Sequence, residues 1–206
     1  FDEADKEMRV SEVETGSENE DFFNIVHTGL FAADGNPLEL WKALAEIAAG
    51  DAEFAVKLRI RLSGKTDTQI VEAISAAGLG KNLVNLGYVS HGEAVREQCG
   101  ASMLILPLRQ EPEYRAVLPG KLFEYLASRR PVLGIGQTDG AMARVLEQAH
   151  AGVTFNWNDT EGIRKEVTRC WQLFREGRLD DNEEDIERYS RRRLTRQMAE
   201  VFESLI

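Results

Sequence analysis

The chain of 206 residues carries 25 lysines and arginines against 35 aspartates and glutamates, a formal net charge of −10, and 43% of its residues are hydrophobic. This composition is typical of a globular protein, and no apolar run is long enough to span a bilayer. Nine acidic and two basic residues lie in residues 1–21, so residues 22–206 carry a net charge of only about −3. That near balance argues against a broad nucleic-acid-binding surface.

Residues 1–21 have the composition of an acidic linker or an exposed tail, and we expect them to add no strand to the fold. The chain begins with Phe1 and shows no signal-peptide pattern, so we expect a piece of a longer protein. Cys99 and Cys170 have no cysteine or histidine partners at metal-ligand spacing. Two reduced thiols are expected, as in a cytosolic protein.

From residue 22 onward, short apolar segments alternate with amphipathic ones. The predicted strands are 23–28, 56–64, 82–89, 102–108, 132–136 and 152–157. The predicted helices are 36–50, 67–78, 90–100, 120–128, 139–149, 159–177 and 183–205, with Ser90 and Asp159 as N-caps. This alternation indicates βαβ units. We therefore predict a doubly wound α/β domain with a mainly parallel six-stranded sheet flanked by helices, whose ligands bind beyond the carboxyl ends of the strands.

Three glycines follow predicted strands at that edge of the sheet. Gly29 follows the first strand, Gly64 the second, and Gly136 ends the fifth. Ordinary turn chemistry explains any one of them, because glycine permits a positive φ. Three at the same edge, together with the uncapped helix near Gly120, favour a phosphate-bearing ligand.

The start of the helix near Gly120 is unusual. Pro119 and Gly120 offer no side-chain acceptor for the first amides, and Lys121 is a cation in the first turn, where the helix dipole disfavours it. One interpretation is a surface lysine that covers Phe123. The other is a site for a phosphate-bearing ligand, which would use both the free amides and the lysine.

The segment LPGKLFEYLASRRPVLGIG (118–136) resembles the donor-site segment of GT-B glycosyltransferases, particularly the bacterial family 4-like enzymes of glycosyl transferases group 1. The matching residues are Pro119, Lys121, Leu122, Glu124, Tyr125, Leu126, Ala127, Pro131 and Val132. The segments FNIVHTGLFAADGNPLELWKAL, KLRIRLSGK and NLVNLGYVSHGEAVREQCGASMLILPL resemble the preceding elements of the same domain. The likeness therefore covers nearly the whole chain from residue 22.

The resemblance implies that residues 22–206 form the C-terminal, nucleotide-sugar-binding half of a two-domain enzyme whose N-terminal acceptor domain is absent from this sequence. The substrate would be a nucleoside diphosphate sugar, with no cofactor and no metal. The whole enzyme is expected in the bacterial cytoplasm, in cell-surface polysaccharide synthesis, with possible peripheral contact at the inner membrane face. The isolated half should bind nucleotide weakly and transfer no sugar.

The resemblance also implies roles for individual residues. Glu124 would accept hydrogen bonds from the ribose hydroxyls, and Lys121 with the amides near Gly120 would bind the diphosphate. Further groups carried over are Gly29, Gly64 and Lys65 toward the diphosphate, and Tyr88 and Val89 toward the base, largely through the backbone. The competing interpretations are a surface pair of Lys121 with Glu124 and a plain turn at Tyr88.

Two positions depart from the family pattern. Gly35 stands where close relatives often carry an arginine, and Ala116 stands where many members carry a second glutamate near the donor sugar. Glu113 is a candidate for the catalytic carboxylate only if the loop register differs, and Arg109 and Arg115 in the same loop are candidates for sugar or phosphate contact. His27, His91 and His150 do not cluster in sequence, and no Asp-x-Asp motif is present.

Alternatives remain at this point. A nucleotide-sugar epimerase of the same fold would carry its catalytic groups in the missing half, and a degenerate interaction module would account for Gly35 and Ala116. The SGK sequence at 63–65 lacks the upstream glycine spacing of a Walker A loop, which excludes a P-loop ATPase. The arginines at 191–193 and 196 fit either a membrane surface or a solvated helix face.

Overall fold

The computed structural model describes residues 21–179 and 186–203. The expected acidic linker lies almost wholly outside these residues. No helix of the described part is both long and apolar enough to cross a membrane.

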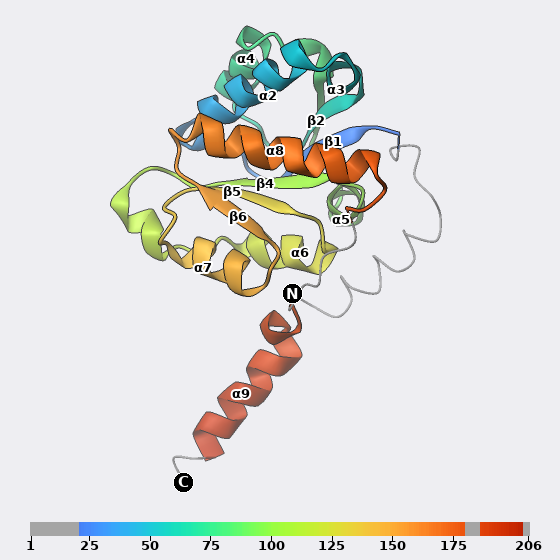
Figure 1. The fold of residues 1–206 in the computed structure, drawn as a ribbon. Coiled ribbons are helices and arrows are strands. Elements are labelled where there is room, and N and C mark those ends of the chain that lie inside the picture. Colours follow the sequence, from blue (N-terminus) through green and yellow to red (C-terminus); the bar gives the residue numbers. More distant parts are fainter. Residues whose placement is uncertain (1–20, 180–185, 204–206) are drawn as a thin grey trace.

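Six parallel strands form one sheet in the order β3-β2-β1-β4-β5-β6 (Figure 1). The strands are β1 Phe23–Thr28, β2 Leu58–Ser63, β3 Leu83–Gly87, β4 Met103–Pro107, β5 Val132–Ile135 and β6 Gly152–Phe155. The helices are α2 Leu38–Gly50, α3 Ala52–Lys57, α4 Thr68–Ala76, α5 His91–Cys99, α6 Gly120–Ser128, α7 Ala141–Gln148, α8 Thr160–Arg175 and α9 Arg191–Glu203. Short 3₁₀ turns are η1 Ala33–Gly35, η2 Gly80–Asn82, η3 Pro112–Ala116 and η4 Glu187–Tyr189. The predicted doubly wound α/β fold is confirmed.

The sheet separates two apolar cores. On one face α2, α3, α4 and α8 pack against side chains such as Phe23 and Ile25 of β1. On the other face α6 and α7 pack against the alternate residue Val26 and against β4 and β5. Every residue of β1 is buried, as expected for a central parallel strand covered on both faces.

The region before β2 differs from the prediction. We expected a strand from Val56, but residues 52–57 form α3, and β2 begins at Leu58. Asp51 caps this helix by accepting a hydrogen bond from the Phe54 amide (3.0 Å), and Phe54 is buried in the core. Val56 is 68% exposed, so its apparent place in the strand alternation was a coincidence of spacing.

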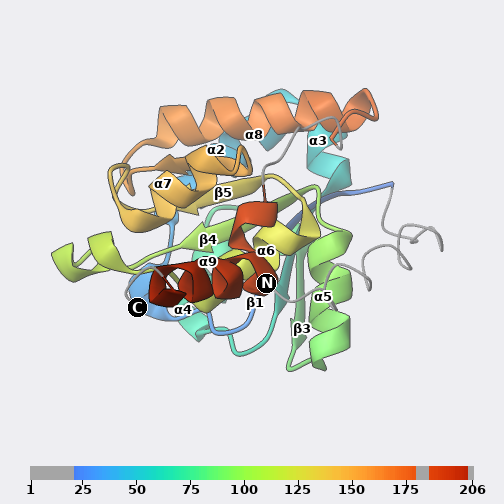
Figure 2. The same cartoon turned by 90° about the horizontal axis from the view of Figure 1, so that it is seen from below.

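The last helix also begins later than predicted. Residues 186–190 hold a 3₁₀ turn, and α9 starts at Arg191 rather than near residue 183. It extends away from the sheet, and its side chains, the arginines at 191–193 and 196 included, are exposed. Figure 2 gives the view from below, with α9 in the foreground.

Both predicted N-caps are confirmed. Ser90 and Glu93 form a reciprocal capping box at the start of α5, and Asp159 accepts from the Gly162 amide (2.8 Å) at the start of α8. These caps fix where the two helices begin.

Candidate functional site

The strand order places a topological switch point between β1 and β4, and we call the region beyond the carboxyl ends of these two strands the crevice. The helices that follow β1 and β2 cover one face of the sheet, and those that follow β3, β4 and β5 cover the other. The connections after β1 and β4 therefore leave the sheet in opposite directions. Such a switch point, at the carboxyl ends of the strands, is where open α/β sheets bind ligands.

Two glycine turns line the β1 side of this crevice. Gly29 has a φ of +88° and Gly64 a φ of +118°, which favour glycine. The Gly29 amide donates to the Ser63 carbonyl (2.6 Å), and the Gly64 amide donates to the Gly87 carbonyl (2.6 Å). A Cβ on Gly64 would collide with the backbone of Gly29. The structure thus brings these two predicted site residues into direct contact.

Ser63 adds an unusual buried hydroxyl at the same place. It is the parallel register partner of Thr28, so the two side chains leave the sheet on the same face. The residue is buried, and within the described part of the chain its hydroxyl has no hydrogen-bond partner.

Lys121 crosses the crevice from the first turn of α6. Pro119 precedes the helix and provides no side-chain cap. The Lys121 Nζ atom donates to the Leu30 carbonyl (3.0 Å) and lies 3.0 Å from His27 Nε2. A Cβ on Gly29 would lie 3.5 Å from Cε and Nζ of the lysine. Burial lowers the pKa of Lys121 to about 8, because the charged ammonium loses solvation there.

His27, in β1, is the buried partner of this lysine. Its ring is 2% exposed, and Nδ1 lies 3.1 Å from the Ile105 carbonyl oxygen. Burial, reinforced by the positive charge of Lys121, lowers the pKa of His27 to about 3. The imidazole is therefore neutral at physiological pH. The sequence reasoning gave His27 no role.

Glu124 is held by a buried network that links α5, α6 and β1. Gln98 Nε2 donates to Glu124 Oε2 (3.2 Å) and to Thr28 Oγ1 (3.0 Å). The Thr28 amide donates to the Tyr125 hydroxyl (3.0 Å). Burial raises the pKa of Tyr125 to about 12, so this hydroxyl stays protonated. Gln98 is also a residue that sequence reasoning missed.

The other predicted nucleotide-binding residues lie at the same edge without joining this network. The Phe31 amide donates to the Lys65 carbonyl (2.9 Å), which places the backbone of Lys65 beside the β1 turn; the Lys65 side chain is exposed. Tyr88 follows β3 and is 94% exposed, while Val89 is half-buried.

Two further glycines lie at the same edge of the sheet. Gly120 opens α6, and a Cβ there would meet no other described residue within 4 Å. Gly136 follows β5, two strands away from β1, and packs against the apolar side chains of Leu108 and Met142. Gly136 therefore shares the sheet edge but not the Lys121 cluster.

The loop after β4 carries the remaining candidates. Arg109 pairs with Asp34 of η1 (2.8 Å), and Arg115 pairs with Asp139 before α7 (2.6 Å). Glu113 lies in η3 and is exposed. In the described residues no group of three or more His, Cys, Asp or Glu side chains is placed to hold a metal ion.

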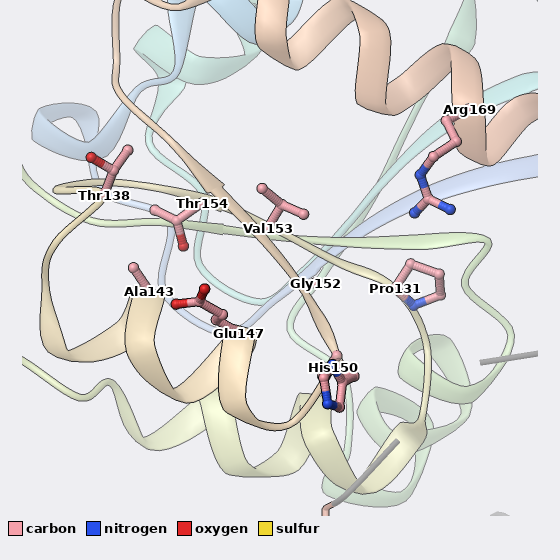
Figure 3. A pocket seen from close by; sticks show the side chains of 10 residues that line it. Pro131, Thr138, Ala143, Glu147, His150, Gly152, Val153, Thr154 and Arg169 are labelled. Carbon is pink, nitrogen blue, oxygen red and sulfur yellow. The ribbon is translucent and has the colours of Figure 1, made fainter. Parts of the chain in front are cut away.

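One pocket of the described surface lies away from this crevice. A hollow of about 470 Å³ lies beside the edge strand β6, between α7 and α8. Glu147 and His150 line it from one side and Arg169 from the other (Figure 3). Arg169 is paired there with Glu166 (2.7 Å). This hollow is separated from Lys121 and Glu124 by β4 and β5.

The sheet order, the two helical layers and the cluster at the switch point define a Rossmann-like α/β domain. Residues 23–172 match the family described as Glycosyl transferases group 1, and the chain belongs to this family. None of the curated proteins compared with the chain matches it.

Solved structures show the same fold. HepE (Alr3699) of Anabaena, in complex with UDP-glucose, has a TM-score of 0.63 at 16% identity, over 98% of this chain and 53% of that one. Sucrose-phosphate synthase (tll1590) of Thermosynechococcus elongatus has a TM-score of 0.63 at 15% identity, and the match covers 96% of this chain and 48% of that one. WaaG, a glycosyltransferase involved in lipopolysaccharide biosynthesis, has a TM-score of 0.56 at 12% identity, and the match covers 89% of this chain and 48% of that one. The chain thus spans about half the length of these proteins, and it has the fold of a C-terminal GT-B domain.

Proposed function

We propose that the domain binds the nucleoside diphosphate of a sugar donor at the switch-point crevice, as one half of a glycosyltransferase. The observation that carries this proposal is the position of Lys121. Its ammonium is held between His27 and the Leu30 carbonyl, against Gly29, at a helix start that has no side-chain cap.

The electrostatics of the crevice favour an anion. The lowered pKa of Lys121 shows that burial disfavours its charge, and a bound diphosphate would offset that cost. The first amides of α6 have no side-chain acceptor and point toward the same end of the helix, as in phosphate sites at helix N-termini. Gly29 leaves room for a ligand because it has no side chain.

Glu124 is placed to bind the next part of such a ligand. It lies one turn after Lys121 on α6, and residues three apart on a helix are neighbours, with Cβ atoms about 5–6 Å apart. Gln98 engages Oε2 of the carboxylate, which orients the group and leaves Oε1 for a ligand. A carboxylate accepts strong hydrogen bonds from two vicinal hydroxyls, so Glu124 would bind the ribose.

In transfer of the sugar, the bond between the sugar and the diphosphate breaks and negative charge develops on the departing diphosphate. Lys121 and the amides of α6 would stabilise that charge. The acceptor would be bound by a second domain, because the related structures are about twice as long as this chain. Tyr88, Val89 and Lys65 remain proposed contacts to the base and the diphosphate.

The test is calorimetric titration of the chain with UDP, UDP-glucose and guanosine diphosphate. UDP-glucose is included because it is the ligand of HepE. We expect binding of at least one nucleotide, lost in Lys121→Ala and kept in Lys42→Ala, a matched change of an exposed lysine on α2. Equal binding by both variants would place the nucleotide elsewhere.

A further inference from the structure

The two shortest polar contacts of the His27 ring agree on one tautomer. A carbonyl oxygen only accepts hydrogen bonds, so the 3.1 Å contact between Nδ1 and the Ile105 carbonyl requires a proton on Nδ1. A neutral imidazole then carries no proton on Nε2, which accepts a hydrogen bond from Lys121 Nζ at 3.0 Å. Nε2 also lies 3.3 Å from the Leu30 carbonyl oxygen, a longer contact that the opposite tautomer would use. That tautomer would set two lone pairs against each other at Ile105 and leave the Leu30 carbonyl as the one described acceptor for Lys121.

The arrangement leaves one hydrogen of the ammonium group unused. An ammonium has three N–H donors, and the described contacts take two, one to His27 and one to the Leu30 carbonyl. The anchors are rigid, because the His27 ring is buried in β1 and packs on Phe31 with 4.1 Å between ring centroids. A long lysine side chain held this way has already lost much of the conformational freedom that binding would cost.

We propose that His27 is a positioning residue, whose unprotonated Nε2 holds the Lys121 ammonium over Gly29 with its third N–H directed at the diphosphate. This inference rests on the proposed function of the crevice. A neutral acceptor suits the task, because it fixes the lysine without neutralising it. An aspartate or glutamate in place of His27 would cancel the charge and repel the phosphates.

The remaining charged group near Lys121 is consistent with this role. Glu124 lies on the same helix and raises the pKa of Lys121, against the larger lowering caused by burial. The carboxylate is drawn toward Gln98 instead of pairing with the ammonium. Lys121 and Glu124 are thus kept as separate donor and acceptor groups, each held by its own neutral buried partner.

Two substitutions at His27 separate positioning from packing. In His27→Asn the side-chain amide can still donate to the Ile105 carbonyl but is too short to reach Lys121. In His27→Gln the longer amide can accept from Lys121. His150→Asn is the matched control, because His150 is exposed beside β6 and its φ of 52° suits asparagine.

The first measurement needs no ligand. Competitive acetylation read by mass spectrometry gives the pKa of Lys121 in each variant. We expect about 8 in the unchanged chain and His150→Asn. In His27→Asn the pKa should move toward the ordinary lysine value, because the released ammonium returns to water. His27→Gln should stay near the unchanged chain.

The second measurement is calorimetric titration with UDP and with uridine. His27→Asn should weaken UDP binding roughly tenfold, because a charged hydrogen bond contributes about that much. Uridine affinity should stay unchanged in this variant. His27→Gln should recover most of the loss in UDP affinity. An unaltered Lys121 pKa and UDP affinity in His27→Asn would overturn the positioning role, and so would equal losses for UDP and uridine in both variants. If the unchanged chain binds no nucleotide, the proposed function fails first, and the role of His27 in it fails too.

Discussion

Arg109 Nε lies 2.8 Å from Asp34 Oδ2, and the two residues belong to the segments that follow β4 and β1. The pair therefore spans the two sides of the switch-point crevice. Both side chains are a little over 40% exposed, so the ion pair itself contributes little to stability. The arginine expected to contact sugar or phosphate is thus paired with a carboxylate beside Gly35.

We predict opposite effects for the two partners of this pair. Asp34→Asn should strengthen UDP binding a few-fold, because it removes a negative charge from the crevice and frees the guanidinium for the diphosphate. Arg109→Ala should weaken UDP binding. Both should change the free energy of unfolding by less than about 1 kcal/mol, as for an exposed ion pair. Titration calorimetry at low salt and thermal denaturation check this, and affinity changes of the same sign would refute it.

Glu124→Gln should weaken binding of UDP and of uridine alike, by roughly 1–3 kcal/mol, the usual worth of a hydrogen bond to a charged group. The new amide oxygen can still accept from Gln98, so the side chain keeps its orientation. Thermal stability should change by tenths of a kcal/mol up to about 1 kcal/mol, the dipole contribution of a glutamate near a helix start. A loss confined to UDP would contradict a ribose contact.

The lowered pKa of Lys121 predicts that the free energy of unfolding increases at alkaline pH. Its pKa is about 8 in the folded chain and 10.5 in the unfolded one. Between these values the unfolded chain holds a proton that the folded chain has released, so the free energy of unfolding increases with pH. Lys121→Met should lack this part of the rise. Chemical denaturation from about pH 7.5 to 10.5 gives the free energy of unfolding of both proteins. Curves of this free energy against pH that run parallel would contradict the lowered pKa of Lys121.

The same lowered pKa predicts that the chain takes up a proton at Lys121 when it binds a nucleoside diphosphate. A diphosphate favours the charged ammonium and so raises the pKa of Lys121. UDP affinity should therefore fall as pH rises through about 8, whereas uridine affinity should not. Calorimetry in buffers of different ionisation enthalpy at pH 8.5 should show proton uptake with UDP, and its absence in Lys121→Met is the control. Equal uptake in that variant would assign the proton to another group.

The sequence predicted the layers of the fold better than its boundaries. Alternating apolar segments revealed all six strands, because a buried parallel strand such as Met103–Pro107 is almost continuously apolar. The helix at Ala52–Lys57 escaped because Val56 extended the alternation of β2 by chance, although Asp51 is a good helix cap. The late start of α9 depends on the turn at Glu187–Tyr189, which carries no strong turn residue.

The candidate site was predicted only in part. Lys121, Glu124 and the glycine turns stood out because they break local rules or match a motif. His27 and Gln98 act through neighbours 94 and 26 residues away in sequence, and such contacts exist only once the sheet is assembled. A local signal was present in both, since His27 is an ionisable residue within a short segment predicted as a buried strand and Gln98 lies beside the buried Val95 and Cys99 on α5.

The most direct test of the account is a titration of the isotope-labelled chain with UDP, followed by backbone amide NMR shifts. We predict that the largest shifts fall on Gly29, Gly64, Gly120, Lys121 and Glu124, on both sides of the crevice between β1 and α6. Shifts confined to the hollow beside β6, around Glu147 and Arg169, or the absence of any shift at millimolar UDP, would contradict the claim that this crevice binds a nucleoside diphosphate.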